Sequence, residues 1–370
     1  MVYLDYAANT PVEKEVLDTF YEVSLEYIGN PNSPHSLGDK ARVRMEQSTK
    51  RIADLLGAKV NEVIYTSGAS ESNNMAIKGI VNKYKRYGKH IITSYLEHAS
   101  VTGPITALQN DGCEVDFVNL TEDGQIDLNH LKELIREDTI LVSVCYVDSE
   151  VGIIQPIDEI LKIVKTKAHC FMHVDATQAV GKIPVDFSGV DLMTFSGHKF
   201  YGINGCGVLL KKESIMLEPL IHGGISTSFR SGTPALSLAV SIEKALTLSV
   251  KDLSGRYEHV KALNLMLREK LQVYSAIKIN TPLESSPYIL NLSIKGVNTN
   301  QIQNKLNEME IYVATKSACC APNTVSRPVY AMTKDRKLAL STLRISLSHL
   351  TTAAELESFL EGFKKAMDES

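Results

Sequence analysis

Short hydrophobic runs alternate with longer amphipathic stretches over the first two thirds of the chain. The runs have the length of buried strands, about four to eight residues, and the stretches between them are typical of helices. Strands and helices that alternate in this way favour a mainly parallel sheet covered by helices, an α/β fold. We expect seven strands, at Val63–Thr66, His90–Ser94, Glu114–Val118, Ile140–Tyr146, Cys170–Asp175, Asp191–Phe195 and Gly207–Leu210.

The pattern changes after a hydrophobic helical stretch that ends near residue 250. The polar sequence KDLSGRYEH begins at Lys251, and the runs that follow it indicate a smaller α+β domain; they are Tyr288–Ile294, Gln301–Glu308 and Ala353–Met367. A chain of 370 residues is long enough for two domains. We predict a large domain over residues 12–250 and a small domain formed by residues 1–11 and 251–370.

Charge and hydropathy argue against several classes of protein. The chain has 39 basic and 43 acidic residues, so it lacks the overall positive field of nucleic-acid-binding proteins. No hydrophobic run approaches the roughly 20 residues of a membrane-spanning helix. The sequence begins with MVYLDYA, without the features of a signal peptide. We expect a cytoplasmic protein that binds neither membrane nor nucleic acid.

Polar side chains follow one of the predicted strands where the chain turns. Lys199 lies in FSGHKFYG, between a small polar run and a glycine turn. A lysine amine can form a Schiff base with an aldehyde, and neighbouring hydroxyls and glycine amides suit a phosphate. Taken alone, a lysine in a polar loop is more often solvated surface.

A second polar cluster strengthens this interpretation. Asp175 and Gln178 follow the strand in FMHVDATQA, and Asp175 lies 24 residues before Lys199. Ligands of open parallel sheets collect at the carboxyl ends of strands, so these side chains should face one crevice. Pyridoxal phosphate needs a lysine for its aldehyde and an anion that keeps its pyridine nitrogen protonated. Asp175 by itself could equally cap the N-terminus of a following helix.

The sequence VIYTSGASESNN, residues 63–74, predicts a strand that passes through a glycine turn into a helix. Ser70 and Glu71 lie in the first turn of that helix. Free amides and the positive end of the helix dipole make an anion site there, and Gly68 allows close backbone approach. The motif has no Walker lysine, so one cofactor phosphate fits better than a triphosphate. The motif alone would also fit an ordinary capped helix.

Six cysteines are present, and their spacing predicts no metal site. Cys319 and Cys320 form a pair in VATKSACCAPNTVSRP, which we predict to be a mobile loop. Composition alone leaves open whether this pair is inert, binds a metal with another chain, or holds a nucleophile. Four cysteines in hydrophobic runs are predicted to be small buried side chains: Cys113, Cys145, Cys170 and Cys206.

Seven short motifs occur in one order over almost the whole chain. They are YLDYAANTP, TSGASES, SYLEHAS with Glu97 and His98, HVDATQ, SGHKFYG, RSGT at Arg230–Thr233, and SAC at Ser317–Cys319. In this order they resemble the cysteine desulfurases, which belong to the class V branch of the fold-type I pyridoxal-phosphate enzymes. The resemblance implies pyridoxal 5′-phosphate as cofactor, L-cysteine as substrate and a homodimer.

The resemblance also implies roles for single residues. Lys199 looks like the lysine that binds the cofactor aldehyde, Asp175 like the partner of the pyridine nitrogen, and Gln178 like a donor to the ring hydroxyl. His98 resembles the histidine that stacks on the pyridine ring and shuttles protons. Arg344 matches the arginine that binds the substrate carboxylate. The remaining cofactor contacts are implied at Ala69, Ser70, Ser149, Ser196 and His198, with Thr233 lent by the second subunit.

By the same resemblance, Cys319 is the nucleophile. Its thiolate takes the sulfur of L-cysteine as a persulfide and leaves L-alanine, with Lys316 favouring the thiolate and His98 a candidate proton acceptor. We expect the sulfur to pass to an acceptor protein such as an iron–sulfur cluster scaffold or a tRNA-thiolation enzyme. Sequence does not name the acceptor, because docking depends on surface detail.

Two other functions stay open. A selenocysteine lyase or an aminotransferase of class V would keep Lys199, Asp175 and His98 but need not use Cys319. A sulfur-relay or scaffold protein would hold the cofactor without turnover.

Departures from the family pattern motivate that second alternative. Asp148 and Ser149 stand where many relatives have two asparagines, and the glycine-rich stretch at His222–Thr233 is altered. Cys320 is a further departure, which could resolve a persulfide or form a cross-link under oxidation.

Overall fold

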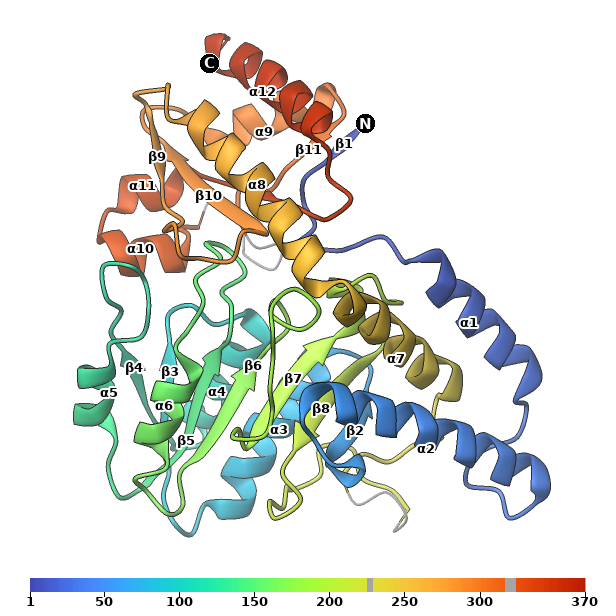
Figure 1. The fold of residues 1–370 in the computed structure, drawn as a ribbon. Helices are drawn as coiled ribbons and strands as arrows, with labels where there is room; N and C mark the ends of the chain where they lie inside the picture. Colours follow the sequence, from blue (N-terminus) through green and yellow to red (C-terminus); the bar gives the residue numbers. More distant parts are fainter. Residues whose placement is uncertain (225–228, 317–323, 370) are drawn as a thin grey trace.

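The structure is a computed structural model of the chain, and it describes residues 1–224, 229–316 and 324–369. Its centre is a seven-stranded sheet in the order β2-β8-β7-β6-β5-β3-β4 (Figure 1). Strand β8 (Gly207–Lys211) is antiparallel to both neighbours, and the other ladders are parallel. The predicted α/β fold with a mainly parallel sheet is confirmed. The other strands are β2 (Val63–Thr66), β3 (His90–Ser94), β4 (Glu114–Val118), β5 (Thr139–Cys145), β6 (Phe171–Asp175) and β7 (Leu192–Ser196).

Successive strand residues face two different helical layers. Leu192 belongs to the hydrophobic core shared with α3 (Ala69–Tyr84) and α4 (Ala99–Asn110). Met193 belongs to the core on the other face, with α2 (Ser36–Leu56), α6 (Ile157–Val164) and α7 (Leu236–Lys251). Because both faces are covered, the central strands β5, β6, β7 and β8 are almost fully buried and rich in hydrophobic residues, which is why the sequence predicts them well. Helix α1 (Lys14–Glu26) packs on α7, and α5 (Leu128–Leu134) packs on α6.

A separate hydrophobic core lies above this sheet in Figure 1. This core packs around an antiparallel sheet in the order β12-β10-β9. A separate two-stranded sheet, in which β1 (Val2–Tyr3) pairs with β11 (Ile311–Tyr312), belongs to the same core. We call residues 1–11 and 251–370 the small lobe and residues 12–250 the large lobe, and we propose this division as the domain organisation. The further elements of the small lobe are α8 (Leu253–Leu271), β9 (Ile277–Ile279), β10 (Ile289–Ile294), α9 (Thr299–Glu308), α10 (Arg327–Thr333), α11 (Arg336–Leu340), β12 (Thr342–Ser346) and α12 (Ala353–Asp368).

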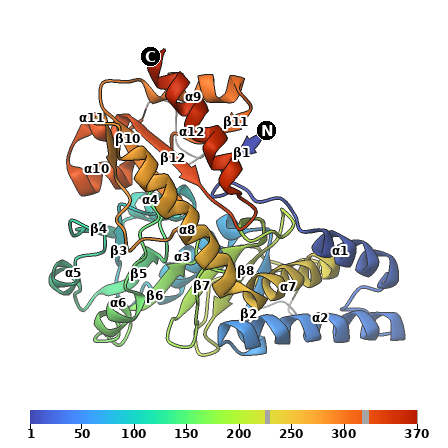
Figure 2. The same cartoon turned by 45° about the horizontal axis from the view of Figure 1, so that its top comes forward.

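Helix α8 connects the two lobes. Helix α7 ends at Lys251 and α8 begins at Leu253, so most of the polar sequence KDLSGRYEH is helical. Figures 1 and 2 show α8 running from the end of α7 into the small lobe, where Val260 and Leu267 enter its core. None of the helices that the structure describes is long and hydrophobic enough to cross a membrane.

The prediction of buried cysteines is correct for three of the four residues. Cys145, Cys170 and Cys206 are buried, but Cys113 is only partly buried. Cys113 precedes β4, which forms the edge of the sheet, so its side chain lacks a neighbouring strand on one side. The prediction for Cys113 was wrong because the hydrophobic run at residues 114–118 does not reveal an edge position.

Candidate active site

A cavity of about 500 Å³ opens at the carboxyl ends of β5, β6 and β7. Their last residues, Cys145, Asp175 and Ser196, all line it. We call it the strand-end cavity. It brings together ten of the predicted site residues: Ala69, Ser70, His98, Ser149, Asp175, Gln178, Ser196, His198, Lys199 and Arg344.

Two predicted site residues are not part of this cavity. Thr233 is exposed and lines a neighbouring cavity of about 430 Å³, which shares Ser67 and Gly205 with the strand-end cavity. Cys319 lies outside the described residues, as does Cys320. The loop predicted around this pair is likewise only partly described.

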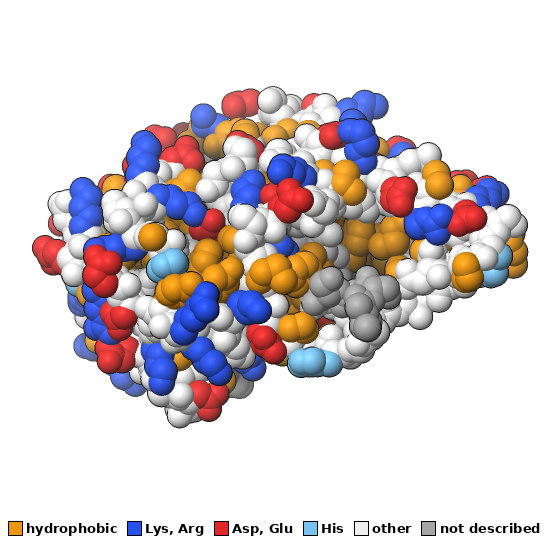
Figure 3. All heavy atoms as spheres, turned by 90° about the horizontal axis from the view of Figure 1, so that it is seen from below, with side chains coloured by type: hydrophobic (Ala, Val, Ile, Leu, Met, Phe, Trp, Pro, Cys, Tyr) orange, Lys and Arg blue, Asp and Glu red, His pale blue; other side chains and the backbone are white. Residues whose placement is uncertain are grey.

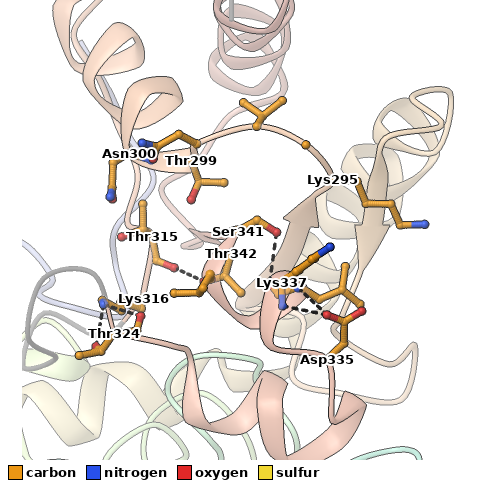
Figure 4. Close-up of a pocket in the computed structure, with 15 residues that line it drawn as sticks. Lys295, Thr299, Asn300, Thr315, Lys316, Thr324, Asp335, Lys337, Ser341 and Thr342 are labelled. Atoms are coloured by element: carbon orange, nitrogen blue, oxygen red, sulfur yellow. Dashed lines mark hydrogen bonds between the residues drawn. The ribbon is translucent and has the colours of Figure 1, made fainter.

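A larger cavity of about 700 Å³ lies in the small lobe, between the starts of α9 and α11 (Figure 4). The ten predicted residues of the strand-end cavity do not line it, and neither does Thr233. Lys316 and Thr324 line it, on either side of residues 317–323, and Lys316 Nζ donates to Thr324 Oγ1 at 2.8 Å. We call it the small-lobe cavity.

Lys199 ends a short turn, Gly197–Lys199, directly after β7. Its Nζ donates to the carbonyl oxygens of Ala7 at 2.8 Å and Ala8 at 2.6 Å. The N-terminal segment is in turn held by β12, because Ala7 N donates to Ser346 Oγ at 2.9 Å. Lys199 therefore lies where β7, the N-terminal segment and the small lobe meet.

Asp175 is buried at the end of β6. Its Oδ2 accepts from Asn73 Nδ2 at 2.9 Å, and its Oδ1 accepts from Thr177 N at 3.0 Å. Asn73 Oδ1 accepts from the Thr194 hydroxyl on β7, which fixes the orientation of the amide. Sequence reasoning missed Asn73, although it lies in the SGASESNN motif, early in α3.

His98 caps the N-terminus of α4. Its Nδ1 accepts from Ser100 N at 3.1 Å, so a neutral ring carries its proton on Nε2. Burial lowers the pKa of His98, and Lys199 and Arg327 lower it further, against the opposing effect of Asp175. The imidazole is therefore neutral at pH 7.

The start of α3 has the geometry of an anion site. Gly68 caps the helix with φ 154°, a conformation that favours glycine, and its Cα lies against Gly207 so closely that a Cβ on Gly207 would be 2.6 Å away. The first-turn amides of α3 have no partners within the helix. Ser196 Oγ, next to this turn, contacts His198 Nδ1 at 2.9 Å.

His198 is neutral in this arrangement. Burial, followed by the charges of Lys199 and Lys182, lowers its pKa to about 4. A phosphate at the start of α3 would therefore be met by amides, a hydroxyl and a neutral ring, which are hydrogen-bonding groups of the kind that anion sites at helix N-termini use.

Arg344 lies on β12 with 1% of its surface exposed. Its Nη1 donates to the carbonyl of Ser149 at 2.9 Å, and its Nη2 donates to Asp5 Oδ1 at 2.7 Å. Among the described residues its buried Nε has no hydrogen-bond partner. The guanidinium is thus oriented by two contacts and keeps further N–H groups for a carboxylate. Ser149 contributes through its backbone as well as lining the cavity.

Two buried carboxyl groups lie behind the cavity wall. Glu97 Oε1 accepts from Ser94 Oγ at 2.6 Å and Cys145 N at 2.8 Å, and burial raises the pKa of Glu97 to about 8. Asp148 Oδ2 accepts backbone N–H groups of the turn that follows it, and burial raises its pKa to about 7. Asp148 therefore shapes this turn, and it does not line the cavity.

Comparison with known proteins agrees with this arrangement. The sequence matches the family Aminotransferase class-V over residues 2–359. A NifS/IcsS protein homolog of Lactobacillus delbrueckii subsp. bulgaricus is 37% identical, over 98% of this chain and 96% of that protein. Cysteine desulfurase IscS of Dictyoglomus turgidum is 36% identical, over 99% of this chain and 94% of that protein.

The fold shows the same relationship. A solved structure described as a NifS-like protein superposes with a TM-score of 0.93 and 34% identity, over the full length of both chains. The resemblance inferred from the seven motifs is confirmed by these matches. The chain belongs to the class-V aminotransferase family, a family of pyridoxal-phosphate-dependent enzymes.

Proposed function

We propose that the protein is a cysteine desulfurase that converts L-cysteine to L-alanine and takes the sulfur onto Cys319. The observation that carries the proposal is the strand-end cavity, which Lys199, Asp175 and Arg344 all line. An amine, a buried carboxylate and a guanidinium at one cavity suit a pyridoxal-phosphate enzyme that acts on an amino acid. The relative named cysteine desulfurase, which is similar over 99% of this chain, supports L-cysteine as the substrate.

The side chains around the cavity fit pyridoxal phosphate. Asp175 would bind the pyridine nitrogen, Gln178 the ring oxygen and Lys199 the aldehyde carbon. The first turn of α3, with Ser196 and His198, would bind the phosphate. When bound, this cofactor supplies a ring that accepts electrons from the bonds of an attached amino acid.

Proton transfer at the substrate would fall to Lys199, with His98 beside it as a hydrogen-bonding group. Unprotonated Lys199 Nζ would take the α proton of the substrate. The neutral ring of His98 carries a proton on Nε2, and the low pKa that burial gives it makes this ring a weak base at pH 7. A neutral imidazole is too weak an acid to release its Nε2 proton, so His98 would act as a hydrogen-bond donor through Nε2–H and leave the α proton to Lys199.

Arg344 would bind the substrate carboxylate. Asp5 already accepts from its Nη2, so the incoming carboxylate competes with Asp5 or binds the remaining N–H groups. A planar guanidinium held at Ser149 keeps one fixed orientation, which in turn fixes the Cα of the substrate.

Cys319 would receive the sulfur. Its thiolate attacks the substrate sulfur, an S–S bond forms as the Cβ–S bond breaks, and protonation of Cβ gives the methyl group of L-alanine. The product on the enzyme is a persulfide. The proposed acceptor is a protein such as an iron–sulfur cluster scaffold or a tRNA-thiolation enzyme, and a cytoplasmic location stays a prediction.

A homodimer is part of the proposal. Thr233 lies in the cavity next to the strand-end cavity, which fits a residue that serves the partner's cofactor. Helix α1 also presents an exposed hydrophobic face, with 48% of Leu17, 65% of Tyr21 and 63% of Leu25 accessible at a spacing of four residues. Figure 3 shows hydrophobic side chains near the centre of one face of the molecule, with charged side chains around them, as expected for a surface that binds another subunit.

The test uses the purified protein supplied with pyridoxal phosphate. We expect a visible absorption band, a borohydride-trapped adduct on Lys199, and equal amounts of alanine and persulfide from L-cysteine. Cys319→Ser should keep the band and lose sulfide release, with Cys113→Ser as the matched control. Unimpaired release by Cys319→Ser would contradict the assignment of Cys319 as the nucleophile, and a bound cofactor without turnover would favour the scaffold.

A further inference from the structure

Lys182 is a buried lysine behind the strand-end cavity, with 4% of its surface exposed. Its Nζ donates to Gln178 Oε1 at 2.7 Å and lies 6.0 Å from the centroid of the Tyr288 ring. Both of these partners are neutral. A buried ammonium that is balanced only by neutral groups costs stability, so its presence calls for a functional reason.

The turn after β6 carries Lys182 to this position. Lys182 N donates to the carbonyl of Ala179, and Gln178 and Lys182 are four residues apart, which puts their side chains on one side of the turn. Gly181 has φ 75°, and a Cβ there would lie 2.7 Å from the Cβ of Phe200, the residue after Lys199. The turn is therefore packed directly against the segment that holds Lys199.

Lys182 determines which way the Gln178 amide points. Lysine can only donate, so the amide oxygen must face Nζ. Gln178 Nε2 donates to the carbonyl of Ala7 at 2.9 Å, and the same carbonyl accepts from Lys199 Nζ at 2.8 Å. The amide is thus fixed at both ends, within a chain of hydrogen bonds that joins the two lysines.

The charged groups acting on Lys182 among the described residues are Lys199 from the β7 turn and Arg344 from β12, both positive. Burial, and then these two cations, lower the pKa of Lys182 to about 7. Lys182 in turn contributes to the low pKa of His198. Four basic side chains, Lys182, His198, Lys199 and Arg344, are therefore electrostatically linked at this end of the cavity.

We propose that Lys182 is a positioning residue of the active site, which holds the Gln178 amide with its N–H groups toward the cofactor ring oxygen and adds a positive charge beside Lys199. This inference rests on the proposed function, because it assigns Lys182 to the same cofactor. Lys182 acts through Gln178 and does not line the cavity itself.

The experiment compares cofactor-loaded wild type with Lys182→Met, Lys182→Arg and Lys162→Met, where Lys162 is exposed on α6. The first measurement is the pH titration of the visible band. Removing a cation from beside Lys199 favours protonation of that nitrogen, so Lys182→Met should raise the apparent pKa by roughly 0.5 unit or more. Lys182→Arg stays charged, so the apparent pKa of its visible band should equal that of the wild type or lie below it.

The second measurement is the unfolding temperature at two pH values. The pKa of Lys182 in the folded protein, about 7, lies below the usual lysine value, so its charged form lowers the free energy of unfolding. This loss of stability is complete below pH 7 and absent above about pH 10.5. Lys182→Met should therefore unfold about 2 °C or more higher than wild type near pH 6.5, and the gain should shrink near pH 10.

Three results would overturn the proposal: an unchanged titration of the visible band in Lys182→Met, an unfolding temperature that falls equally at both pH values, or the same shifts in Lys162→Met. Each would make Lys182 a core side chain without a role in positioning. Absence of a visible band from the wild type would instead contradict the proposed function, while the unfolding temperatures would still report on the buried charge.

Discussion

The strand-end cavity and the small-lobe cavity differ in how their polar side chains are held. The small-lobe cavity is the larger, about 700 against 500 Å³, but Lys295 and Lys337 in its wall are exposed. In the strand-end cavity, Asp175 and Arg344 are buried, and each is oriented by two hydrogen bonds. Burying charge in a fixed geometry costs stability and is found where chemistry needs it. The burial and fixed orientation of the charged side chains, and not the cavity volume, therefore favour the strand-end cavity as the active site.

The largest effect should come from Lys199→Ala. Without the amine, the cofactor aldehyde has no covalent attachment, and we expect alanine formation to fall by about 10³-fold or more, ~4 kcal/mol in the barrier. Steady-state assays with excess pyridoxal phosphate measure this. Lys162→Ala on the surface of α6 is the matched control, and near-normal turnover by Lys199→Ala would remove the main argument for the strand-end cavity.

A smaller loss is expected for Asp175→Asn. The amide can keep the shape and part of the hydrogen bonding but removes the negative charge, so kcat should drop by roughly 100-fold, ~2.7 kcal/mol. Asn73→Ala, which leaves the charge and removes one donor, should lose about tenfold. Equal losses for both variants would mean that the position of the carboxylate matters and its charge does not.

Arg344→Lys tests whether the strand-end cavity binds the substrate carboxylate. A lysine keeps the charge but cannot form the two parallel hydrogen bonds of a guanidinium. We expect KM for L-cysteine to rise by about 10- to 50-fold, ~1.4 to 2.3 kcal/mol, with a smaller change in kcat. A change in kcat alone would place the substrate carboxylate elsewhere.

The smallest effect should come from the small-lobe cavity. Lys337→Ala removes an exposed ammonium from its wall, and we expect alanine formation to stay within about twofold of wild type, ~0.4 kcal/mol. The same assay measures it, next to Lys295→Ala. A loss of tenfold or more in either variant would break the distinction between the two cavities.

Local signals in the sequence were enough for the sheet and for most of the cavity wall. Short runs rich in β-branched and aromatic residues predicted β2, β3 and β4 with their observed bounds, although β2 and β4 are edge strands and only partly buried. Residues at the ends of parallel strands must meet at one edge of the sheet, which is why Asp175 and Lys199 could be placed together before the fold was known.

Contacts between segments far apart in the chain were beyond that reasoning. Asn73 binds Asp175 across 102 residues, and the Ala7 carbonyl accepts from Lys199 across 192. Lys182 looks like one more surface lysine in a polar turn, and only the fold places its buried amine near the Tyr288 ring and within range of the charge of Arg344. The edge position of β4, next to the partly buried Cys113, likewise depends on strand order, and the hydrophobic pattern does not encode that order.

The pairing of the N-terminal segment with β12 has a consequence for biosynthesis. Asp5 contacts Arg344 and Ala7 contacts Ser346, each across 339 residues, so these contacts can form only once β12 has been synthesised. A nascent chain that ends before β12 would lack both Arg344 and the anchor of the Ala7 segment. We therefore expect it not to bind pyridoxal phosphate in a catalytic arrangement. Removal of residues 1–11 or of β12 should therefore abolish alanine formation, because either change breaks both contacts.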